Sequence, residues 1–175
     1  MEYIYVGQIN GTHGLKGELK LKSNFKYKDK ILKENFNFYI GKEKTHEVLK
    51  KSRTHNKNEL LTFKNKEDIN LVEDLRNNKL YINKEDLKLK ENEYVLEDYL
   101  NLDCYYNNQK LGTVKDIIDC GNKNYVLVIK GQKEILIPLN NNFIEKLIKK
   151  DKIVLKEVED LINANWYTNT ISRNV

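Results

Sequence analysis

The chain has 175 residues, of which 39% are hydrophobic and 33% are charged, with 31 Lys and Arg against 26 Asp and Glu. This length can hold one or two domains, and the high charged fraction favours small domains with much surface. The longest apolar run, residues 125–129, is far below the about 20 residues of a membrane-spanning helix, so we expect no membrane partner.

Targeting and redox signals favour the cytoplasm. The first residues lack the basic start and long apolar run of a signal peptide. Cys104 and Cys120 lie in neither a Cys-x-x-Cys nor a zinc-binding spacing, and His13, His46 and His55 also lack ligand spacing. We therefore expect a reduced cytoplasmic protein without a bound metal.

The net charge differs between the two halves of the chain. Residues 1–90 carry 20 basic and 13 acidic side chains, whereas residues 91–175 carry 11 and 13. A basic first half and a mildly acidic second half suggest two different partners. Ordinary solubility charge is the alternative interpretation.

The first distinctive stretch is residues 6–21, where Gly11, Gly14 and Gly17 lie between two segments of alternating apolar and polar residues. Such alternation is typical of strands, and these glycines suit a loop better than a helix, where each would cost about 1 kcal/mol relative to Ala. A phosphate-binding loop or a dinucleotide fingerprint is disfavoured, because both need a helix after the glycines and a strand follows here. From the residue types alone, a structural hairpin is the simplest interpretation.

Short strands and turns follow this stretch. Residues 25–30 place Lys26, Lys28 and Lys30 two apart, which predicts an edge strand that is either solvated or faces phosphate. Further strands are predicted at residues 36–44, 46–53 and 60–63. Several short strands without a helical pattern between them predict a small antiparallel barrel.

One helix is predicted over residues 66–76, with an apolar face that includes Leu71 and Leu75. Asn77 would end this helix, since Asn tolerates the left-handed conformation that a helix stop often requires. A strand at residues 80–82 then completes the first domain.

Residues 83–93 are almost entirely charged or polar and predict a linker between two domains. Beyond it, turn signals at Asn107-Asn108 and Gly121-Asn122 separate predicted strands, and residues 142–149 predict a short helical turn. The strands are predicted at residues 102–106, 110–119, 125–130, 134–139 and 153–158. Residues 164–175 are interpreted as a disordered tail, and docking of Trp166 on a domain surface or on a partner is the alternative.

The glycine stretch is similar to the signature of a known family. Its residues read Gly7-x-Ile9-x-x-x-His13-Gly14-Leu15-Lys16-Gly17-Glu18-Leu19-Lys20. The RimM family of ribosome maturation factors has Gly-x-Ile followed by His-Gly-Leu-Arg/Lys-Gly-Glu-Val/Leu-Lys. The region of the predicted helix resembles the same family at Asp68, Glu73, Leu75, Arg76, Leu80, Tyr81 and Ile82, although Ile69 stands where the family has Arg.

The second half resembles the PRC-barrel domain of RimM proteins. The matching positions are Tyr94, Asp98, Leu100, Leu111-Gly112-x-Val114, Gly121, residues 126–128 and Glu134-x-Leu136-Ile137-Pro138. The family opens this domain with two adjacent aromatic residues, whereas here Tyr94 is followed by Val95. Asn101 also replaces a glycine.

The resemblance implies a mainly β chain of two small antiparallel β-barrel domains, residues 1–84 and 94–163, joined by a short polar linker, with one helix in the first domain. It implies a monomeric, non-catalytic assembly factor for the small ribosomal subunit that uses no cofactor. Such factors bind a head-domain ribosomal protein, small-subunit protein nineteen, and nearby ribosomal RNA during maturation of the 3′ domain. The alternatives are an RNA-modifying enzyme and a generic translation-associated RNA-binding barrel protein.

The resemblance also suggests which residues make contacts. The basic first barrel would face RNA, because lysine-rich surfaces gain affinity by releasing counterions from phosphate. The expected RNA contacts are Lys16, Lys20, Lys22 and Lys26. The expected contacts to the ribosomal protein are Tyr94, Val95 and Tyr99, since aromatic residues are favoured at interface centres. The signature loop comprises Gly11, His13, Gly14 and Gly17, and no catalytic, cofactor-binding or metal-binding residues are expected.

Overall fold

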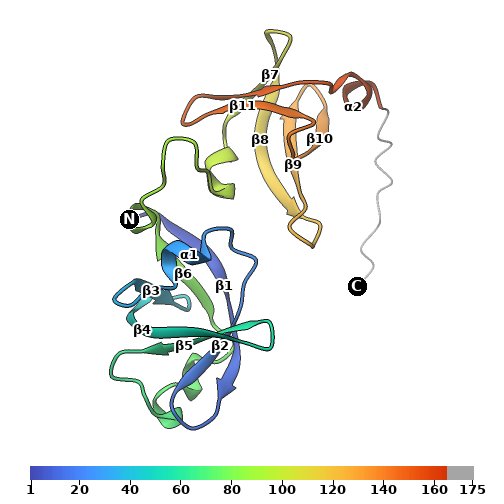
Figure 1. Cartoon of the computed structure of the whole chain (residues 1–175). Helices are drawn as coiled ribbons and strands as arrows, with labels where there is room; N and C mark the ends of the chain where they lie inside the picture. Colours follow the sequence, from blue (N-terminus) through green and yellow to red (C-terminus); the bar gives the residue numbers. More distant parts are fainter. Residues whose placement is uncertain (165–175) are drawn as a thin grey trace. The chain divides into compact units, whose positions relative to one another are not determined.

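The computed structural model describes residues 1–164 and divides into two compact units, Met1–Glu93 and a second that begins at Tyr94 (Figure 1). The prediction of a mainly β chain with two domains is confirmed, and each domain contains a six-stranded sheet. The expectation for the tail, including Trp166, lies outside the described residues apart from Ala164.

The first domain is a closed barrel in which every neighbouring pair of strands is antiparallel. Its strand order is β1-β2-β5-β4-β3-β6, with β6 returning to β1. The elements are β1 (Tyr3–His13), β2 (Glu18–Lys22), α1 (Lys28–Ile31), β3 (Asn37–Ile40), β4 (Thr45–His55), β5 (Asn58–Phe63) and β6 (Lys79–Asn83).

Alternating side chains fill the barrel of the first domain. In β2, Leu19 and Leu21 are buried while Lys20 points outward, as the period of two in a strand requires. Phe38 and Phe63 are fully buried and meet edge to face, with ring centroids 5.9 Å apart. Because closure removes the exposed edges, this small domain can hold its core with short strands.

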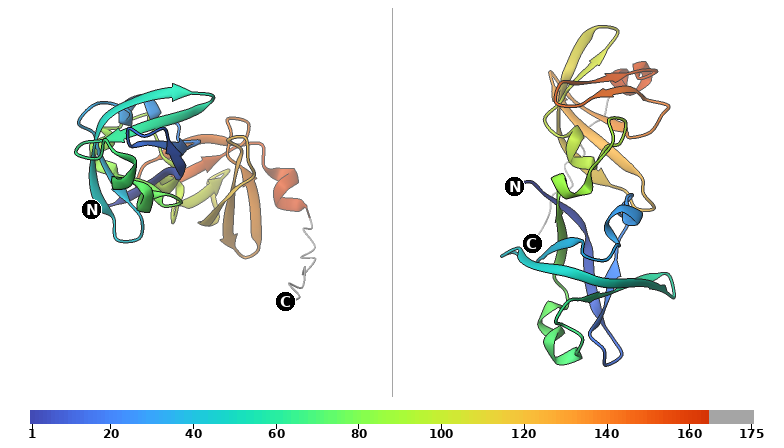
Figure 2. Two further views of the ribbon diagram at one scale, coloured as in Figure 1. Left: turned by 90° about the horizontal axis from the view of Figure 1, so that it is seen from below. Right: turned by 60° about the vertical axis from the view of Figure 1, so that its left-hand side comes forward.

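The segment between β5 and β6 corrects the predicted helix over residues 66–76. It forms two 3₁₀ turns, η1 (Ile69–Leu71) and η2 (Glu73–Leu75), held by i to i+3 hydrogen bonds. The predicted apolar face is incomplete, because Leu71 is 50% exposed. Backbone hydrogen bonds to the β1 region hold both ends of the segment, which lies beside the β1–β2 loop in both views of Figure 2. These tertiary bonds override the local helical periodicity.

The predicted edge strand at residues 25–30 is also wrong. The chain there bends into the one-turn helix α1, with Tyr27 and Ile31 buried and Asp29 between them exposed. A strand would have placed these three residues on one face and forced the carboxylate of Asp29 inward. The helical turn buries the two apolar side chains and leaves the charge in water.

The polar stretch at residues 83–93 is only partly a linker. Asn83 ends β6 and is buried, and the 3₁₀ turn η3 (Lys84–Leu87) follows with Leu87 2% exposed. Because Glu91 and Glu93 belong to the first unit, Met1–Glu93 holds 20 basic and 15 acidic residues, and the chain from Tyr94 holds 11 of each. The chain from Tyr94 is therefore neutral as a whole, and its part up to residue 164 keeps a net charge of −1, less acidic than the division at residue 90 suggested.

The second domain contains one sheet whose described strands follow the order β10-β9-β8-β7-β12-β11, from one edge to the other. The first sheet is thus closed into a barrel by hydrogen bonds between its strands, whereas among the described strands of the second sheet β10 and β11 remain at opposite edges. The β7–β12 pair is parallel, which corrects the expectation of an all-antiparallel domain. The elements are η4 (Leu96–Tyr99), β7 (Asp103–Tyr106), β8 (Gln109–Asp119), β9 (Tyr125–Gly131), β10 (Glu134–Pro138), β11 (Ile144–Ile148), β12 (Lys152–Leu155) and α2 (Glu159–Asn163).

Strand β11 replaces the short helical turn predicted for residues 142–149. It pairs with β12, and Leu147 lies opposite Ile153 in the core of the second domain. The turn between the two strands places Lys150 at a φ of 60°. Pairing with β12 satisfies the backbone groups of β11, so tertiary pairing decided its conformation.

The core of the second domain includes Cys104, which is completely buried. Burial raises the pKa of the Cys104 thiol to about 12, so this cysteine stays protonated and packs as a small apolar side chain. Cys120 is exposed, and both cysteines are free. The helices that the structure describes are too short and too polar to span a membrane.

Candidate functional site

The signature loop joins β1 to β2 and rests on the segment that precedes β6. Gly17 has a φ of +64°, and a Cβ atom built there would lie 2.0 Å from the carbonyl oxygen of Lys66. The Leu15 carbonyl oxygen accepts a hydrogen bond from the backbone N–H of Ile69, with an N···O distance of 3.1 Å. Position 17 therefore needs glycine both for its left-handed backbone and for this close approach.

The remaining glycines of the loop are less constrained. Gly14 has a φ of +62°, but a Cβ there would meet nothing within 4 Å. A Cβ on Gly11 would also be free of contacts within 4 Å. Gly7 lies earlier in β1 and is tightly packed, because a Cβ there would lie 2.5 Å from the carbonyl oxygen of Lys22. The packing of this hairpin thus depends on Gly7 and Gly17.

Side chains around the loop attach it to the β4–β5 hairpin. The rings of His13 and His55 lie with their centroids 4.8 Å apart. The Arg53 guanidinium donates two hydrogen bonds to Glu18, with Nε···Oε1 2.8 Å and Nη2···Oε2 2.7 Å. These bonds hold the pKa of the Glu18 carboxyl below its ordinary value, although its partial burial acts in the opposite direction. The ring contact of His13 and the hydrogen bonds of Glu18 indicate that these two residues of the signature have a structural role.

The four lysines expected to contact RNA lie in and on either side of β2 in the sequence. Lys20 and Lys22 point outward from β2, while Lys16 precedes that strand in the loop and Lys26 follows it. Residues two apart in a strand are about 7 Å apart. Only Lys20 and Lys22 are thus placed about 7 Å apart on the outer side of β2, and Lys16 and Lys26 flank that strand in the chain. We call these four lysines the β2 lysine row.

The β2 lysine row has no acidic partners among residues 1–164, where none of its four ammonium groups forms an ion pair. The acidic side chains nearby are occupied, since Glu18 binds Arg53 and Glu59 lies 3.9 Å from the ammonium group of Lys28. The ammonium group of Lys26 lies 5.1 Å from the centre of the Tyr27 ring. The row can therefore present positive charge to an anionic partner.

The residues expected to contact a protein partner lie at the start of the second domain, and they differ in exposure. Val95 is only 4% exposed, so its side chain is not open to a partner in this structure. Tyr94 and Tyr99 are half-buried and pack against the domain core. The Tyr94 hydroxyl donates a hydrogen bond to the Leu147 carbonyl oxygen at 3.2 Å, and Lys149 lies over the Tyr94 ring. Tyr94 therefore contributes to the fold and presents only part of its surface.

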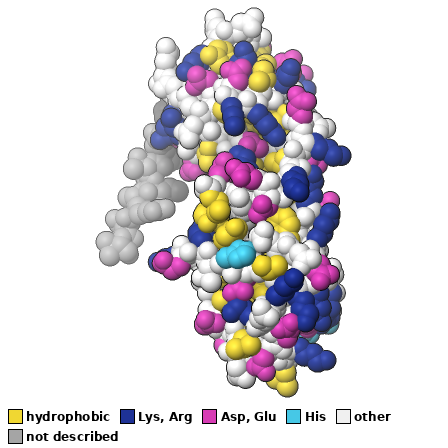
Figure 3. Space-filling view, turned by 90° about the vertical axis from the view of Figure 1, so that its left-hand side faces the viewer, with side chains coloured by type: hydrophobic (Ala, Val, Ile, Leu, Met, Phe, Trp, Pro, Cys, Tyr) yellow, Lys and Arg dark blue, Asp and Glu magenta, His cyan; other side chains and the backbone are white. Residues whose placement is uncertain are grey.

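Sequence reasoning missed a group of tyrosines on the outside of the first barrel. They come from β1, β3 and β6, where each alternates with buried apolar neighbours. The signal was present in Tyr3-Ile4-Tyr5-Val6 and in Leu80-Tyr81-Ile82, because strand periodicity puts the rings outward once the aliphatic residues are inside. On the face shown in Figure 3, hydrophobic side chains are mixed with basic and acidic ones.

A metal centre finds no support among residues 1–164, where no three His, Cys, Asp or Glu side chains lie together as a possible ligand set. His46 illustrates the point, because its Nε2 lies 2.9 Å from the Asn37 side-chain oxygen and its ring packs on Tyr39. The three histidines of the chain thus lie in protein contacts at the barrel surface.

Comparison with known proteins covers both domains. The family model described as the RimM N-terminal domain matches residues 4–87, and the PRC-barrel domain model matches residues 91–162. A ribosome maturation factor RimM from Ligilactobacillus salivarius is 34% identical over 168 residues, covering 92% of this chain and 99% of its own. The same factor from Exiguobacterium is 28% identical over 169 residues, covering 93% and 98%. A crystal structure of RimM from Pseudomonas aeruginosa aligns with a TM-score of 0.45 and 17% identity, covering 89% of this chain and 97% of that one.

Proposed function

Because this chain belongs to the RimM family of ribosome maturation factors, we propose that it is a non-catalytic assembly factor for the small ribosomal subunit. It binds a precursor of that subunit in the cytoplasm as a monomer. It contacts both a ribosomal protein of the head domain, small-subunit protein nineteen, and the neighbouring ribosomal RNA. These contacts assist folding of the 3′ domain.

The observation that carries this proposal is the full-length match to curated relatives. The relative from Ligilactobacillus salivarius is aligned over 92% of this chain and 99% of its own, so the two domains occur together in both proteins. A shared pair of domains supports a shared role better than a match to one domain, since a fold by itself does not imply function. The name of that relative refers to ribosome maturation, and the proposal extends this role to the present chain.

The first domain is proposed to contact RNA through the β2 lysine row. Its ammonium groups have no carboxylate partners within residues 1–164, so binding to phosphate would not require breaking an ion pair. The first unit also carries an excess of five basic residues, 20 against 15. Phosphate contacts of this kind supply affinity and position a protein without reading sequence.

The second domain is proposed to hold the ribosomal protein at Tyr94 and Tyr99. Val95 is not included among the proposed contacts, because its side chain is only 4% exposed. Residues 94–164 carry a net charge of only −1, so this contact would depend on aromatic packing more than on attraction between net charges. Half-buried aromatic residues suit this role, since their rings are already held in place before binding.

Co-sedimentation with small-subunit precursors tests the proposed function. The purified chain is mixed with precursors and, separately, with mature small subunits, and each mixture is separated on a sucrose gradient. We expect the chain to move with precursors and to be depleted from mature subunits. Equal binding to both particles would favour the generic RNA-binding alternative, and measured turnover of an RNA substrate would favour the enzyme.

Substitution of Tyr94 tests the protein contact. We expect Tyr94→Ala to weaken binding to the isolated head-domain ribosomal protein by about 2 kcal/mol and to leave RNA affinity unchanged. Tyr94→Phe is the control, since it keeps the ring and removes only the hydrogen bond to Leu147. A fall in melting temperature together with an equal loss for both partners would make Tyr94 a purely structural residue.

A further inference from the structure

A group of aromatic and basic side chains lies on the outside of the first barrel, across three neighbouring strands. Tyr5 of β1 lies opposite Tyr81 of β6, which in turn lies opposite Tyr39 of β3. Tyr3 precedes Tyr5 by two residues on the same side of β1. These four rings, with Lys44 and Lys79, are called the tyrosine face.

The rings of the tyrosine face contact one another in pairs. Tyr3 and Tyr39 meet edge to face with centroids 4.9 Å apart, and Tyr5 and Tyr81 do so at 5.9 Å. Tyr5 is 47% exposed, which makes it one of the most exposed large apolar side chains among residues 1–164. Cross-strand aromatic pairs stabilise a sheet, but that role does not require such an exposed ring.

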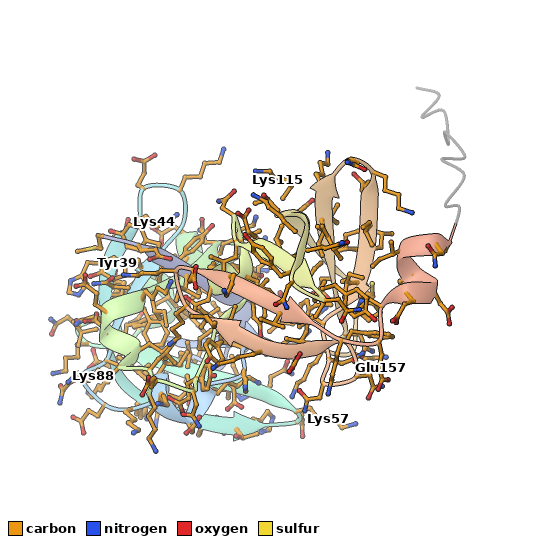
Figure 4. The ribbon with its side chains drawn as sticks, turned by 90° about the horizontal axis from the view of Figure 1, so that it is seen from above. Tyr39, Lys44, Lys57, Lys88, Lys115 and Glu157 are labelled. Atoms are coloured by element: carbon orange, nitrogen blue, oxygen red, sulfur yellow. The ribbon has the colours of Figure 1, made fainter. Side chains whose placement is uncertain are left out.

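Two lysines complete the tyrosine face. The ammonium group of Lys44 lies 3.6 Å from the centre of the Tyr81 ring and 5.7 Å from that of Tyr3. The ammonium group of Lys79 lies 5.9 Å from the centre of the Tyr5 ring. Figure 4 shows Tyr39 and Lys44 on the same side of the first domain. Within the described residues, neither lysine forms an ion pair with a carboxylate.

The positive charges of the tyrosine face lie beside Tyr81, Tyr3 and Tyr5, and a negative charge lies beside Tyr39. Glu2 is engaged by Lys84, with an Nζ···O distance of 2.8 Å, whereas the Asp86 carboxylate raises the pKa of Tyr39, so an anionic ligand is favoured at the Tyr5–Tyr81 end of the face. Burial raises the pKa of the Tyr5 and Tyr39 hydroxyls, so both rings are uncharged at neutral pH. The face therefore combines neutral aromatic rings with two lysines that form no ion pair within residues 1–164, although the Lys44 ammonium group also donates a hydrogen bond to the Gly41 carbonyl oxygen at 3.2 Å.

We propose that the tyrosine face binds unpaired nucleotides of RNA, with bases stacked on Tyr5 and its neighbours and phosphates bound by Lys44 and Lys79. The inference rests on the proposed function, because it gives the same assembly factor a second RNA contact beside the β2 lysine row. In RNA-binding modules built on a sheet, exposed rings stack two or three bases, and lysines bind the backbone. Lys44 between Tyr81 and Tyr3, and Lys79 beside Tyr5, provide the positive charge that the phosphates of a stacked strand would need.

The test uses the full chain and a fluorescein-labelled decamer of uridines, with an RNA duplex for comparison, and measures fluorescence anisotropy at several salt concentrations. We expect Tyr5→Ala to weaken binding to the single strand about tenfold, as expected for one lost base stack, with little effect on the duplex. Tyr5→Phe keeps the ring and should bind within about twofold of the unchanged chain. The salt dependence should stay the same for both variants, because no phosphate contact is removed.

Photo-cross-linking locates the bound base independently of affinity. A decamer carrying 5-bromouridine is irradiated on the unchanged chain, and the cross-linked peptide is identified by mass spectrometry. We expect the cross-link within residues 3–5 or 79–83. A cross-link confined to the β1–β2 loop or to β2 would overturn the inference and leave the lysine row as the RNA contact.

The outcomes separate this inference from the proposed function. If Tyr5→Ala binds the decamer as well as the unchanged chain does, or if neither binds it, the tyrosine face is not an RNA site. Co-sedimentation with precursors can still succeed in that case, so the proposed function stands. If Tyr5→Ala keeps its RNA affinity and loses the ribosomal protein, the face is a protein-docking surface and the inference is overturned.

Discussion

Gly14 and Gly17 have nearly the same backbone conformation and very different surroundings. Their φ angles are +62° and +64°, but a Cβ meets nothing within 4 Å at Gly14 and lies 2.0 Å from a backbone oxygen at Gly17. Both glycines belong to the same sequence motif. The pair therefore separates the cost of left-handed backbone from the cost of a steric clash.

We predict that Gly17→Ala destabilises the chain by about 3 kcal/mol, because it adds a clash with the Lys66 carbonyl to the conformational strain. Gly14→Ala, the matched control, should cost only about 1 kcal/mol for the left-handed conformation. Urea unfolding of both variants measures the difference. Equal costs would mean that the segment before β6 moves away freely from the loop.

Glu18 should make stability depend on pH in the acidic range. The pKa of its carboxyl is lowered from 4.5 in the folded state, mainly by the hydrogen bonds from Arg53. The stabilisation is therefore fully present above pH 4.5 and is lost as the pH falls through the lowered pKa. Arg53 itself stays protonated throughout this range.

We predict that Glu18→Gln lowers the free energy of unfolding at neutral pH and that this deficit shrinks as the pH falls below 4.5 and through the lowered pKa of the Glu18 carboxyl. The Gln side chain does not titrate, so the variant lacks this part of the acid dependence. Urea unfolding of both proteins across a pH series provides the measurement. A deficit that stays constant with pH would show that the charge of Glu18 contributes nothing.

At the scale of the element, β2 places its apolar and its charged side chains on opposite sides of the strand. Leu19 and Leu21 contribute to the barrel core, and Lys20 and Lys22 lie outside. Charge can thus be changed on one side without removing a core contact. This property makes β2 a suitable place to test binding separately from folding.

We predict that Lys20→Glu with Lys22→Glu weakens RNA association and lowers the slope of log affinity against log salt by about 2 units, one for each phosphate contact. The matched control is Lys115→Glu with Lys123→Glu, two exposed lysines of the second domain, which changes the net charge equally. Melting temperatures of both variants should match that of the unchanged chain. An unchanged slope would assign Lys20 and Lys22 to ordinary solvated surface.

At the scale of the whole molecule, the boundary between the two units falls later than the polar composition suggests. Lys84 donates to Glu2 through its side chain, and its backbone N–H donates to the Glu2 carbonyl oxygen at 2.9 Å. Leu87 is buried, and Lys88 then adopts a left-handed conformation with a φ of 46°. The ordered first domain thus continues through η3.

We predict that a lysine-specific protease cuts the connection between the domains after Lys88 before it cuts after Lys84. Cleavage requires an exposed backbone that can open locally, and η3 is held by hydrogen bonds and a buried leucine. Mass spectrometry of early fragments identifies the site. Early cleavage after Lys84 would show that η3 opens as easily as a linker. Simultaneous loss of both domains would show that they unfold as one unit.

Several elements could be predicted from sequence because one local rule decided them. Strand periodicity placed Leu19 and Leu21 inside and Lys20 outside, as the structure shows. Asn77 adopts the expected left-handed conformation, with a φ of 62°, although the expected helix before it is absent. The outward positions of Lys20 and Lys22 were found in the same way, since they follow from the period of two, whereas Lys16 and Lys26 lie outside the strand.

The elements that were predicted wrongly depend on contacts between residues far apart in the chain. Residues 66–76 have a helical pattern, but the N–H groups of Ile69 and Asn77 donate to the carbonyl oxygens of Leu15 and Ile9, and the segment between these tertiary bonds forms 3₁₀ turns. The sequence of β11 predicted a helical turn, but the segment forms a strand because it pairs with β12. The burial of Val95 and the division of charge between the domains likewise became clear only from the three-dimensional arrangement.

The sequence by itself determined the two-domain β architecture, the family and the basic character of the first half, because periodicity, motif spacing and charge are properties of the local chain. Only the tertiary structure decided that four tyrosines from β1, β3 and β6 meet on one face with Lys44 and Lys79. Barrel closure brings β6 beside β1 although more than 60 residues separate them, and no local pattern records that pairing.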